Sequence, residues 1–130
     1  MYRPAGYPGG AGARYRNIDM SSRLDGASPH RLVAILFEEL ITAIETAQAA
    51  HRHGEMGKRA ERQARALSIL HALEGSLDFE RGGDIANTLA SIYREARRLI
   101  SAGGRANQPE LVEQARAMLA DIASAWESIG

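Results

Sequence analysis

The sequence has no cysteine, few aromatic residues and no excess of charge of either sign. A chain without cysteine forms no disulfide, carries no thiolate nucleophile and holds no cysteine-ligated zinc, which suits a reducing cytoplasm. Because 16 Lys and Arg balance 16 Asp and Glu, the basic surface typical of a dedicated nucleic-acid-binding protein is missing. No apolar run is long enough to span a membrane, and the N-terminus lacks the apolar stretch of a secretory signal. We therefore expect a cytoplasmic protein that neither binds nucleic acid nor inserts into a membrane.

The length and composition favour a single helical domain. A chain of 130 residues can bury one hydrophobic core but not two independent ones. Alanine, the strongest helix former, accounts for 23 residues, whereas aromatic residues make up 5% of the chain. No segment alternates apolar and polar residues as a strand would. The composition therefore predicts an all-α protein.

The first 27 residues differ in composition from the remainder of the chain. Residues 6–12 are rich in Gly and Pro and cannot form the interior of a helix. Beyond them, apolar side chains stand among polar ones at Tyr15, Ile18 and Met20. One interpretation is a disordered tail, which is common at chain termini. The other is a flexible arm, residues 1–27, that packs on the domain through these side chains.

Apolar residues recur at helical spacing in four segments after the arm. Ser28 can cap the first helix, and Pro29 suits its first turn. The pattern predicts helices at about 29–53, 58–76, 84–101 and 108–128, which together make a domain of residues 28–130. Gly103 and Gly104 are expected to lie in the loop that ends the third helix. Four such helices joined by short connectors pack most simply as an antiparallel up-down four-helix bundle.

The first helix has more apolar residues than one core-facing stripe requires. Ile35 flanks one edge of that stripe and Ile41 lies beyond the other, while Ile69 lies near the edge of the second helix's apolar arc. These residues either belong to the core of an irregular bundle or form a second apolar surface. A second apolar surface would mark the binding site of a partner protein.

The sequence offers no arrangement typical of catalysis or of a metal site. His51 and His53 are two residues apart, which places them on nearly opposite sides of a helix. No Glu-x-x-His motif accompanies Glu38 and Glu39, as a di-iron bundle would need. The glycines of residues 6–12 are not followed by the Lys-Ser/Thr of a phosphate-binding loop. We therefore expect no enzyme activity, no cofactor and no metal.

Four stretches of the sequence resemble the FliS family of flagellar export chaperones, in the family's order and spacing. They correspond to the family's N-terminal arm, its first-helix signature, the connector between its second and third helices, and the end of its fourth helix. The stretches are Met1-Tyr2 with Tyr15-x-x-Ile18, Ala27-Ser28-Pro29-His30-Arg31-Leu32 with Leu36-Phe37-Glu38, Leu77 to Ala86, and Ala125-Trp126-Glu127-Ser128-Ile129. The resemblance extends over essentially the whole chain.

The resemblance implies a helical bundle and also a function that periodicity cannot supply. Proteins of this family bind the disordered C-terminal segment of flagellin in the cytoplasm and prevent its premature polymerisation. The complex is then recognised by a component of the flagellar type III export gate, and the arm acts as a flap over part of the flagellin-binding surface. The residues expected to contact flagellin are Tyr15 and Ile18, from their place in the arm motif, and Met20, Ile35, Ile41 and Ile69, from the helical-wheel argument.

Three other functions are open at this point. A helical-bundle adaptor could form a homodimer through its surplus apolar surface, without any client. A hydrolase or metal enzyme could use His30, His51 and His53. A nucleic-acid-binding module is the third, and the zero net charge argues against it.

Overall fold

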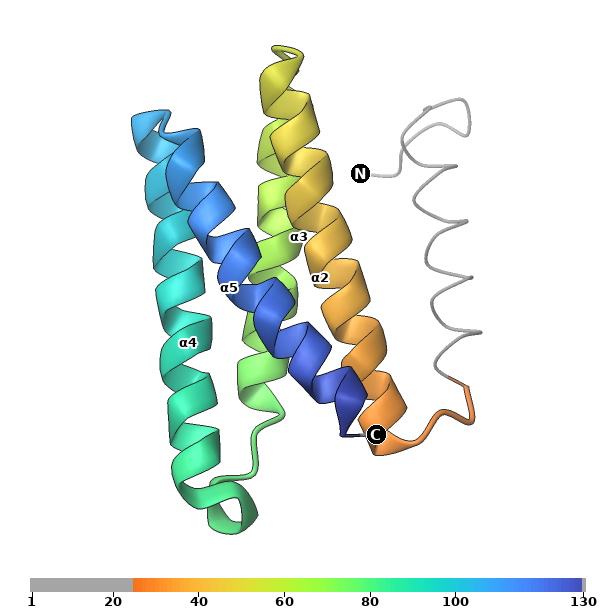
Figure 1. Ribbon diagram of the computed structural model, residues 1–130. Helices are drawn as coiled ribbons and strands as arrows, with labels where there is room; N and C mark the ends of the chain where they lie inside the picture. Colours follow the sequence, from red (N-terminus) through yellow and green to blue (C-terminus); the bar gives the residue numbers. More distant parts are fainter. Residues whose placement is uncertain (1–24, 130) are drawn as a thin grey trace, which may run out of the picture.

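The computed structural model describes residues 25–129, which form four α-helices and, within that range, no strand. The helices are α2 (Pro29–Arg52), α3 (Met56–Gly75), α4 (Phe79–Ala106) and α5 (Pro109–Ser128). Successive helices run in opposite directions (Figure 1), and each contacts two neighbours in the closed order α2, α3, α4, α5. The prediction of an all-α, up-down four-helix bundle is thereby confirmed. The predicted arm, residues 1–27, lies almost wholly outside the described residues, so its packing stays a prediction.

Helix α2 is bounded by residue types that favour a helix start and a helix stop. The Ser28 hydroxyl accepts a hydrogen bond from the backbone N–H of Arg31 at 3.1 Å, and Pro29 occupies the first turn. After the helix, Gly54 has a φ of 73°, a conformation that costs little only for glycine. The chain then enters α3 at Met56, two residues before the predicted start at residue 58.

Helix α4 begins at Phe79, earlier than the start predicted at residue 84. The Asp78 carboxylate accepts hydrogen bonds from two backbone N–H groups of this first turn, at 3.1 Å each, and so caps it. Gly83, whose φ of 50° and ψ of −124° are not helical, separates this turn from the rest of α4. The segment expected to be a connector is therefore a capped helical turn followed by a kink.

Gly103 and Gly104 lie inside α4, although the sequence predicts that the helix has already ended. The helix continues to Ala106, and Asn107, with a φ of 52°, ends it instead. Gly103 is buried against α5: a Cβ atom on it would lie 2.7 Å from Cγ2 of Val112. The close approach of the two helices therefore requires a residue without a side chain at this position.

We expect Gly103→Ala to lower the free energy of unfolding by about 1–3 kcal/mol, because the added methyl group overlaps α5. Gly104→Ala is the matched control. A Cβ there meets only the end of the flexible Gln63 side chain, with Oε1 at 2.7 Å. This second variant should leave the stability unchanged or raise it by up to about 1 kcal/mol, since alanine favours helix. Urea unfolding followed by circular dichroism measures both; equal effects of the two variants would contradict the close approach at Gly103.

The core lies between the four helices and is built from apolar side chains of all of them. Apart from Tyr93 with its hydroxyl, no side chain that carries a polar or charged group is buried within residues 25–129. The largest fully buried side chains are Ile35, Leu40, Ile44, Leu70, Leu73, Ile100 and Leu119. Burying a side chain of this size contributes roughly 1.5–3 kcal/mol. Apolar residues at helical spacing in the third and fourth predicted helices include Ile85 and Ile129, which predicts that both face the core. Both are instead exposed.

Helix α5 is tied to α2 near both of its ends. Near the start of α5, the Gln48 side-chain amide donates to Glu113 Oε1 at 2.9 Å. Hydrogen bonds from Arg116 and Gln48 lower the pKa of Glu113 to about 2. At the other end, the rings of His30 and Trp126 are stacked with centroids 4.6 Å apart.

Two hydrogen bonds reinforce this stacked pair. The Trp126 indole N–H donates to the backbone O of His30 at 3.0 Å, and His30 Nε2 lies 2.8 Å from the backbone O of Trp126. The start of α2 and the end of α5 are thus joined by a stacked and doubly hydrogen-bonded pair, which we call the His30–Trp126 pair.

We expect Trp126→Phe to lower the free energy of unfolding by about 1–2 kcal/mol, because phenylalanine keeps an aromatic ring but has no N–H to donate. Ile129→Ala, at an exposed residue one turn further on, should change it by less than about 0.5 kcal/mol. Because Trp126 is the single tryptophan of the chain, unfolding must be followed by circular dichroism rather than by fluorescence. An unchanged stability of Trp126→Phe would show that the pair does not hold the two helices together.

Candidate functional site

An apolar hollow of about 340 Å³ opens at the end of the bundle where α2 starts and α5 ends. All four helices and the connector between α3 and α4 contribute to it. Its larger apolar lining residues are Val33, Phe37, Leu73, Leu77, Ile85, Leu89, Ile122 and Trp126. We call this site the apolar hollow. A concave apolar site with a few polar groups at its edge is typical of ligand and peptide binding.

The course of α5 explains why this end of the bundle is open. Helix α5 starts beside the end of α4 and crosses toward the start of α2, so that its last turns lie away from the start of α4 (Figure 1). The first turns of α4 are therefore less covered than its last turns. Ile85, just after the kink at Gly83, keeps 72% of its surface exposed, and Phe79, in the first turn, is also exposed. These apolar side chains face solvent although they belong to a helix of the bundle.

Tyr93 lies at the inner side of the apolar hollow. The residue is buried, and its ring is 6.4 Å from that of Phe37 at a tilt of 48°. Its hydroxyl makes no hydrogen bond to any residue in the range 25–129. Burial raises the pKa of Tyr93 to about 12, because a phenolate would be poorly solvated there. The hollow thus contains one polar group without a protein partner.

Replacing Tyr93 should reveal this burial in the pH dependence of stability. The unfolded chain ionises Tyr93 near pH 10, whereas the folded protein does so only near pH 12. The stability is therefore unaffected below pH 10 and falls as the pH rises from 10 to 12, by up to ~1.4 kcal/mol per pH unit.

In Tyr93→Phe this part of the fall should be absent. At pH 7 the variant should be about as stable as the original, because the hydroxyl that it loses makes no hydrogen bond to residues 25–129. Urea unfolding at neutral pH and at several alkaline pH values measures both effects. Parallel alkaline curves for the two proteins would show that the hydroxyl is solvated.

A second, larger hollow of about 490 Å³ lies at the opposite end of the bundle, and its lining combines apolar with charged residues. Its ionisable side chains are His51, Arg52 and Arg59 together with Glu110 and Glu113. Arg59 Nη1 donates to the backbone O of Gly104 at 3.4 Å, and its buried Nε has no hydrogen-bond partner among residues 25–129. Because this second hollow mixes charges of both signs, it is less suited to an apolar chain segment than the apolar hollow is.

The structure does not bring together the histidines considered for an enzyme. His30 is bonded to Trp126 at one end of α2, whereas His51 lies near the other end, about 32 Å along the helix. His53 Nδ1 lies 2.8 Å from the backbone O of Ala49. Within residues 25–129 no three side chains of His, Asp or Glu are grouped so that they could hold a metal ion.

The predicted contact residues fall into two groups. Tyr15, Ile18 and Met20 lie outside the described residues. Ile35 and Ile69 are buried, with 1% and 5% of their surface exposed, and Ile41 is half-buried against the core. The last three do not line the apolar hollow. Of the two interpretations open for Ile35 and Ile69, burial favours the core over an exposed second surface; whether they also contact a partner stays a prediction.

The apolar hollow itself was not anticipated from helical periodicity. Ile85, Leu89 and Trp126 fit regular apolar stripes, which by themselves predict a place in the core. The sequence does contain one indication of the hollow. Phe79 and Ile85 are large apolar residues on either side of Gly82-Gly83, whereas connectors of this kind are usually polar. Phe79 and Ile85 are exposed because α5 diverges from α4. That divergence depends on packing between helices and cannot be predicted from the sequence of either helix alone.

The flagellar protein FliS family matches residues 11–130 of this chain. The chain belongs to the FliS family. The flagellar secretion chaperone FliS of Salmonella typhimurium is 32% identical over 117 residues, which cover 88% of this chain and 86% of that protein. The protein of the same name from Vibrio cholerae is 31% identical over 115 residues, 88% of this chain and 85% of its own length. The one from Escherichia coli is 29% identical, over 87% of this chain and 84% of its own.

Three of the four FliS-like stretches meet at the apolar hollow. The first-helix stretch contributes Phe37, the stretch from Leu77 to Ala86 contributes both of those residues and Ile85, and the last stretch contributes Trp126. The fourth, the arm, lies outside the described residues. The FliS-like residues of this chain therefore gather at one end of the bundle.

None of the helices within residues 25–129 is both long and apolar enough to cross a membrane.

Proposed function

We propose that this protein is a cytosolic export chaperone that binds the disordered C-terminal segment of flagellin. By holding that segment it prevents premature polymerisation and supports delivery of flagellin to the flagellar type III export gate. The role is one of binding and not of catalysis, and it needs neither a cofactor nor a metal. Membership of a family whose relatives are named flagellar secretion chaperones supports the proposal.

The observation that carries the proposal is the convergence of FliS-like stretches on the apolar hollow. A disordered client loses chain entropy when it folds on its partner, so it needs apolar surface to offset that cost. Ile85 and Phe79 offer such surface without any rearrangement, because both are already exposed. The hollow of about 340 Å³ next to them can receive apolar side chains of the client.

The predicted contact residues extend this surface. Tyr15, Ile18 and Met20 are proposed to act from the arm, and Ile41 from the half-buried edge of α2. Ile35 and Ile69 are buried, so a contact from either would need the covering residues to move first. A client that wraps the domain can reach both the hollow and α2, because the hollow begins at Val33 and Phe37 of that helix.

Calorimetric titration with a flagellin C-terminal peptide of about forty residues tests the proposal. We expect a 1:1 complex that Ile85→Ser weakens at least about tenfold, because a polar side chain replaces an apolar contact. Ile129→Ser is the matched control, since Ile129 is 71% exposed against 72% for Ile85 but does not line the hollow. The control should bind within about twofold of the original protein.

Three results would count against this function. If flagellin peptide from the same cell gives no heat and no shift in size exclusion, the protein does not bind this client. If Ile85→Ser and Ile129→Ser bind equally well, the client does not use the apolar hollow. A stable dimer in sedimentation that flagellin peptide leaves unchanged would favour the homodimerising adaptor.

A further inference from the structure

A third concave surface, with a chemistry unlike that of the apolar hollow, lies between α3 and α4. Its volume is about 360 Å³, and its lining is Leu67 and His71 of α3 with Arg94, Arg97, Arg98 and Ser101 of α4. We call it the arginine hollow. Its lining includes three guanidinium groups and no carboxylate. The whole chain has zero net charge. The positive charge of this face therefore arises from where the arginines lie and not from an excess of basic residues.

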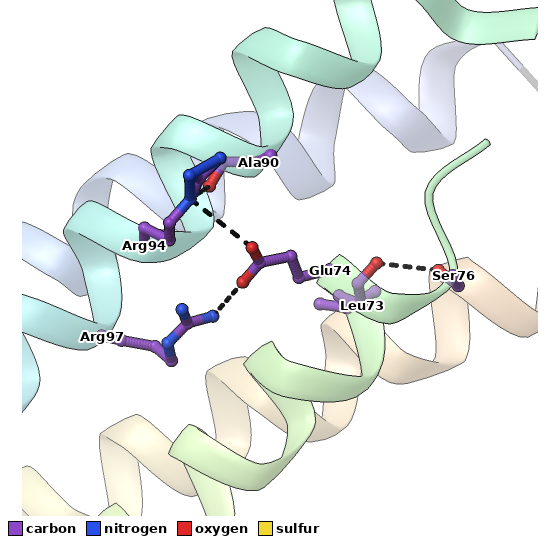
Figure 2. Close-up of polar contacts among 6 residues, drawn as sticks. All are labelled: Leu73, Glu74, Ser76, Ala90, Arg94 and Arg97. Atoms are coloured by element: carbon purple, nitrogen blue, oxygen red, sulfur yellow. Dashed lines mark hydrogen bonds and ion pairs between the residues drawn. The ribbon is translucent and has the colours of Figure 1, made fainter. Parts of the chain in front are cut away.

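The nearby carboxylates do not occupy all the N–H donors of these guanidinium groups. Glu74 is shared: Arg97 donates to its Oε1, and Arg94 Nε lies 3.5 Å from its Oε2 (Figure 2). Glu95 accepts from Nε and Nη2 of Arg98, at 2.9 and 2.6 Å. Two carboxylates therefore pair with three guanidinium groups, so one positive charge is left over. Each guanidinium also offers five N–H donors.

Several donors remain for an incoming group. Arg94 Nε donates to the backbone O of Ala90 at 3.3 Å, and its two terminal amino groups have no partner among residues 25–129. The side chains of Arg94 and Arg98 are 57% and 62% exposed, so both can be reached from solvent. A further carboxylate could thus be bound without breaking the pairs that exist. Glu74 already illustrates how the site binds one, between Arg94 and Arg97 (Figure 2).

The spacing of the arginines favours an acidic helix over a small anion or a lipid surface. Arg94, Arg97 and Arg98 stand at positions i, i+3 and i+4, which places them along one face of α4. Carboxylates at the same spacing on a partner helix would each meet a guanidinium group, in the planar geometry that arginine prefers. A flat anionic membrane has no such spacing, so it would meet Glu74 and Glu95 as well as the arginines, whereas a helix can place its carboxylates on the guanidinium groups.

We propose that the arginine hollow is a docking site for an acidic helical segment of a second protein. It shares no lining residue with the apolar hollow. Binding of an acidic partner therefore leaves the apolar hollow open, and the two sites can be occupied together. This proposal does not rest on flagellin binding and stands whether or not flagellin is the client.

The test uses two alanine-based peptides of about 20 residues, long enough to form helix. One has glutamates at i, i+3, i+4 and i+7 on a single face; the other has glutamines at the same positions. Fluorescence anisotropy at about 50 mM salt measures binding of each to the full-length protein. We expect the glutamate peptide to bind, the glutamine peptide not to bind, and the affinity to fall as salt is added.

The variant Arg94→Gln/Arg98→Gln removes two positive charges from the hollow and should weaken binding at least about tenfold. Arg31→Gln/Arg105→Gln removes two charges from exposed residues elsewhere and should change it less than about twofold. Arg94 and Arg98 are exposed, so the fold should persist; the variant Arg94→Lys/Arg98→Lys, which keeps the charges, should bind with intermediate affinity.

Four outcomes would overturn the proposal. The first is equal binding of the glutamate and glutamine peptides, and the second is an equal loss in both double glutamine variants. The third is displacement of the glutamate peptide by inorganic phosphate at the same concentration, which would indicate a site for small anions. The fourth is binding to vesicles of phosphatidylglycerol and phosphatidylcholine in the absence of any peptide binding, which would indicate a membrane.

Discussion

The close approach of α4 and α5 at Gly103 is the constraint on which the shape of this bundle depends. A Cβ at that position would lie 2.7 Å from Cγ2 of Val112, so the two helices can meet there only through a residue without a side chain. At its far end, α5 is joined to α2 by the His30–Trp126 pair. Helix α5, which approaches α4 closely at its start and is paired with α2 at its end, crosses the bundle diagonally, as Figure 1 shows. The start of α4 is consequently left uncovered, and the apolar hollow opens beside it.

The two sides of this molecule present different chemistry because different helix pairs form them. The apolar hollow forms where α5 leaves α4, and core-type residues such as Ile85 and Leu89 stay partly or largely exposed there. Helices α3 and α4 form the arginine hollow along their contact. Their outer surface carries arginines that share too few carboxylates. A chain with zero net charge can therefore present one apolar surface and one cationic surface.

Signals that depend only on neighbouring residues predict this structure better than signals that depend on a partner helix. The cap at Ser28 was confirmed because it depends only on neighbouring residues. The third predicted helix was too short at both ends, since Asp78 caps an additional turn and Gly103 is held in the helix by packing against α5. Ile85 and Ile129 follow a core-facing stripe yet are exposed, because a stripe records which face is apolar and not whether a neighbour covers it. Ile35 and Ile69 lie at the edges of the apolar stripes of their helices, yet both are buried.

The sequence by itself determined the class of fold, the number of helices after the arm, and the family. Helical periodicity and capping act over a few residues, and the FliS-like stretches are contiguous, so all three can be read along the chain. Only the tertiary structure decided that Phe37, Ile85 and Trp126 meet at one site, and that Arg94 and Arg97 share Glu74. Those neighbours belong to different helices, and the angle at which α5 crosses the bundle depends on how side chains fit between helices, which no single helix encodes.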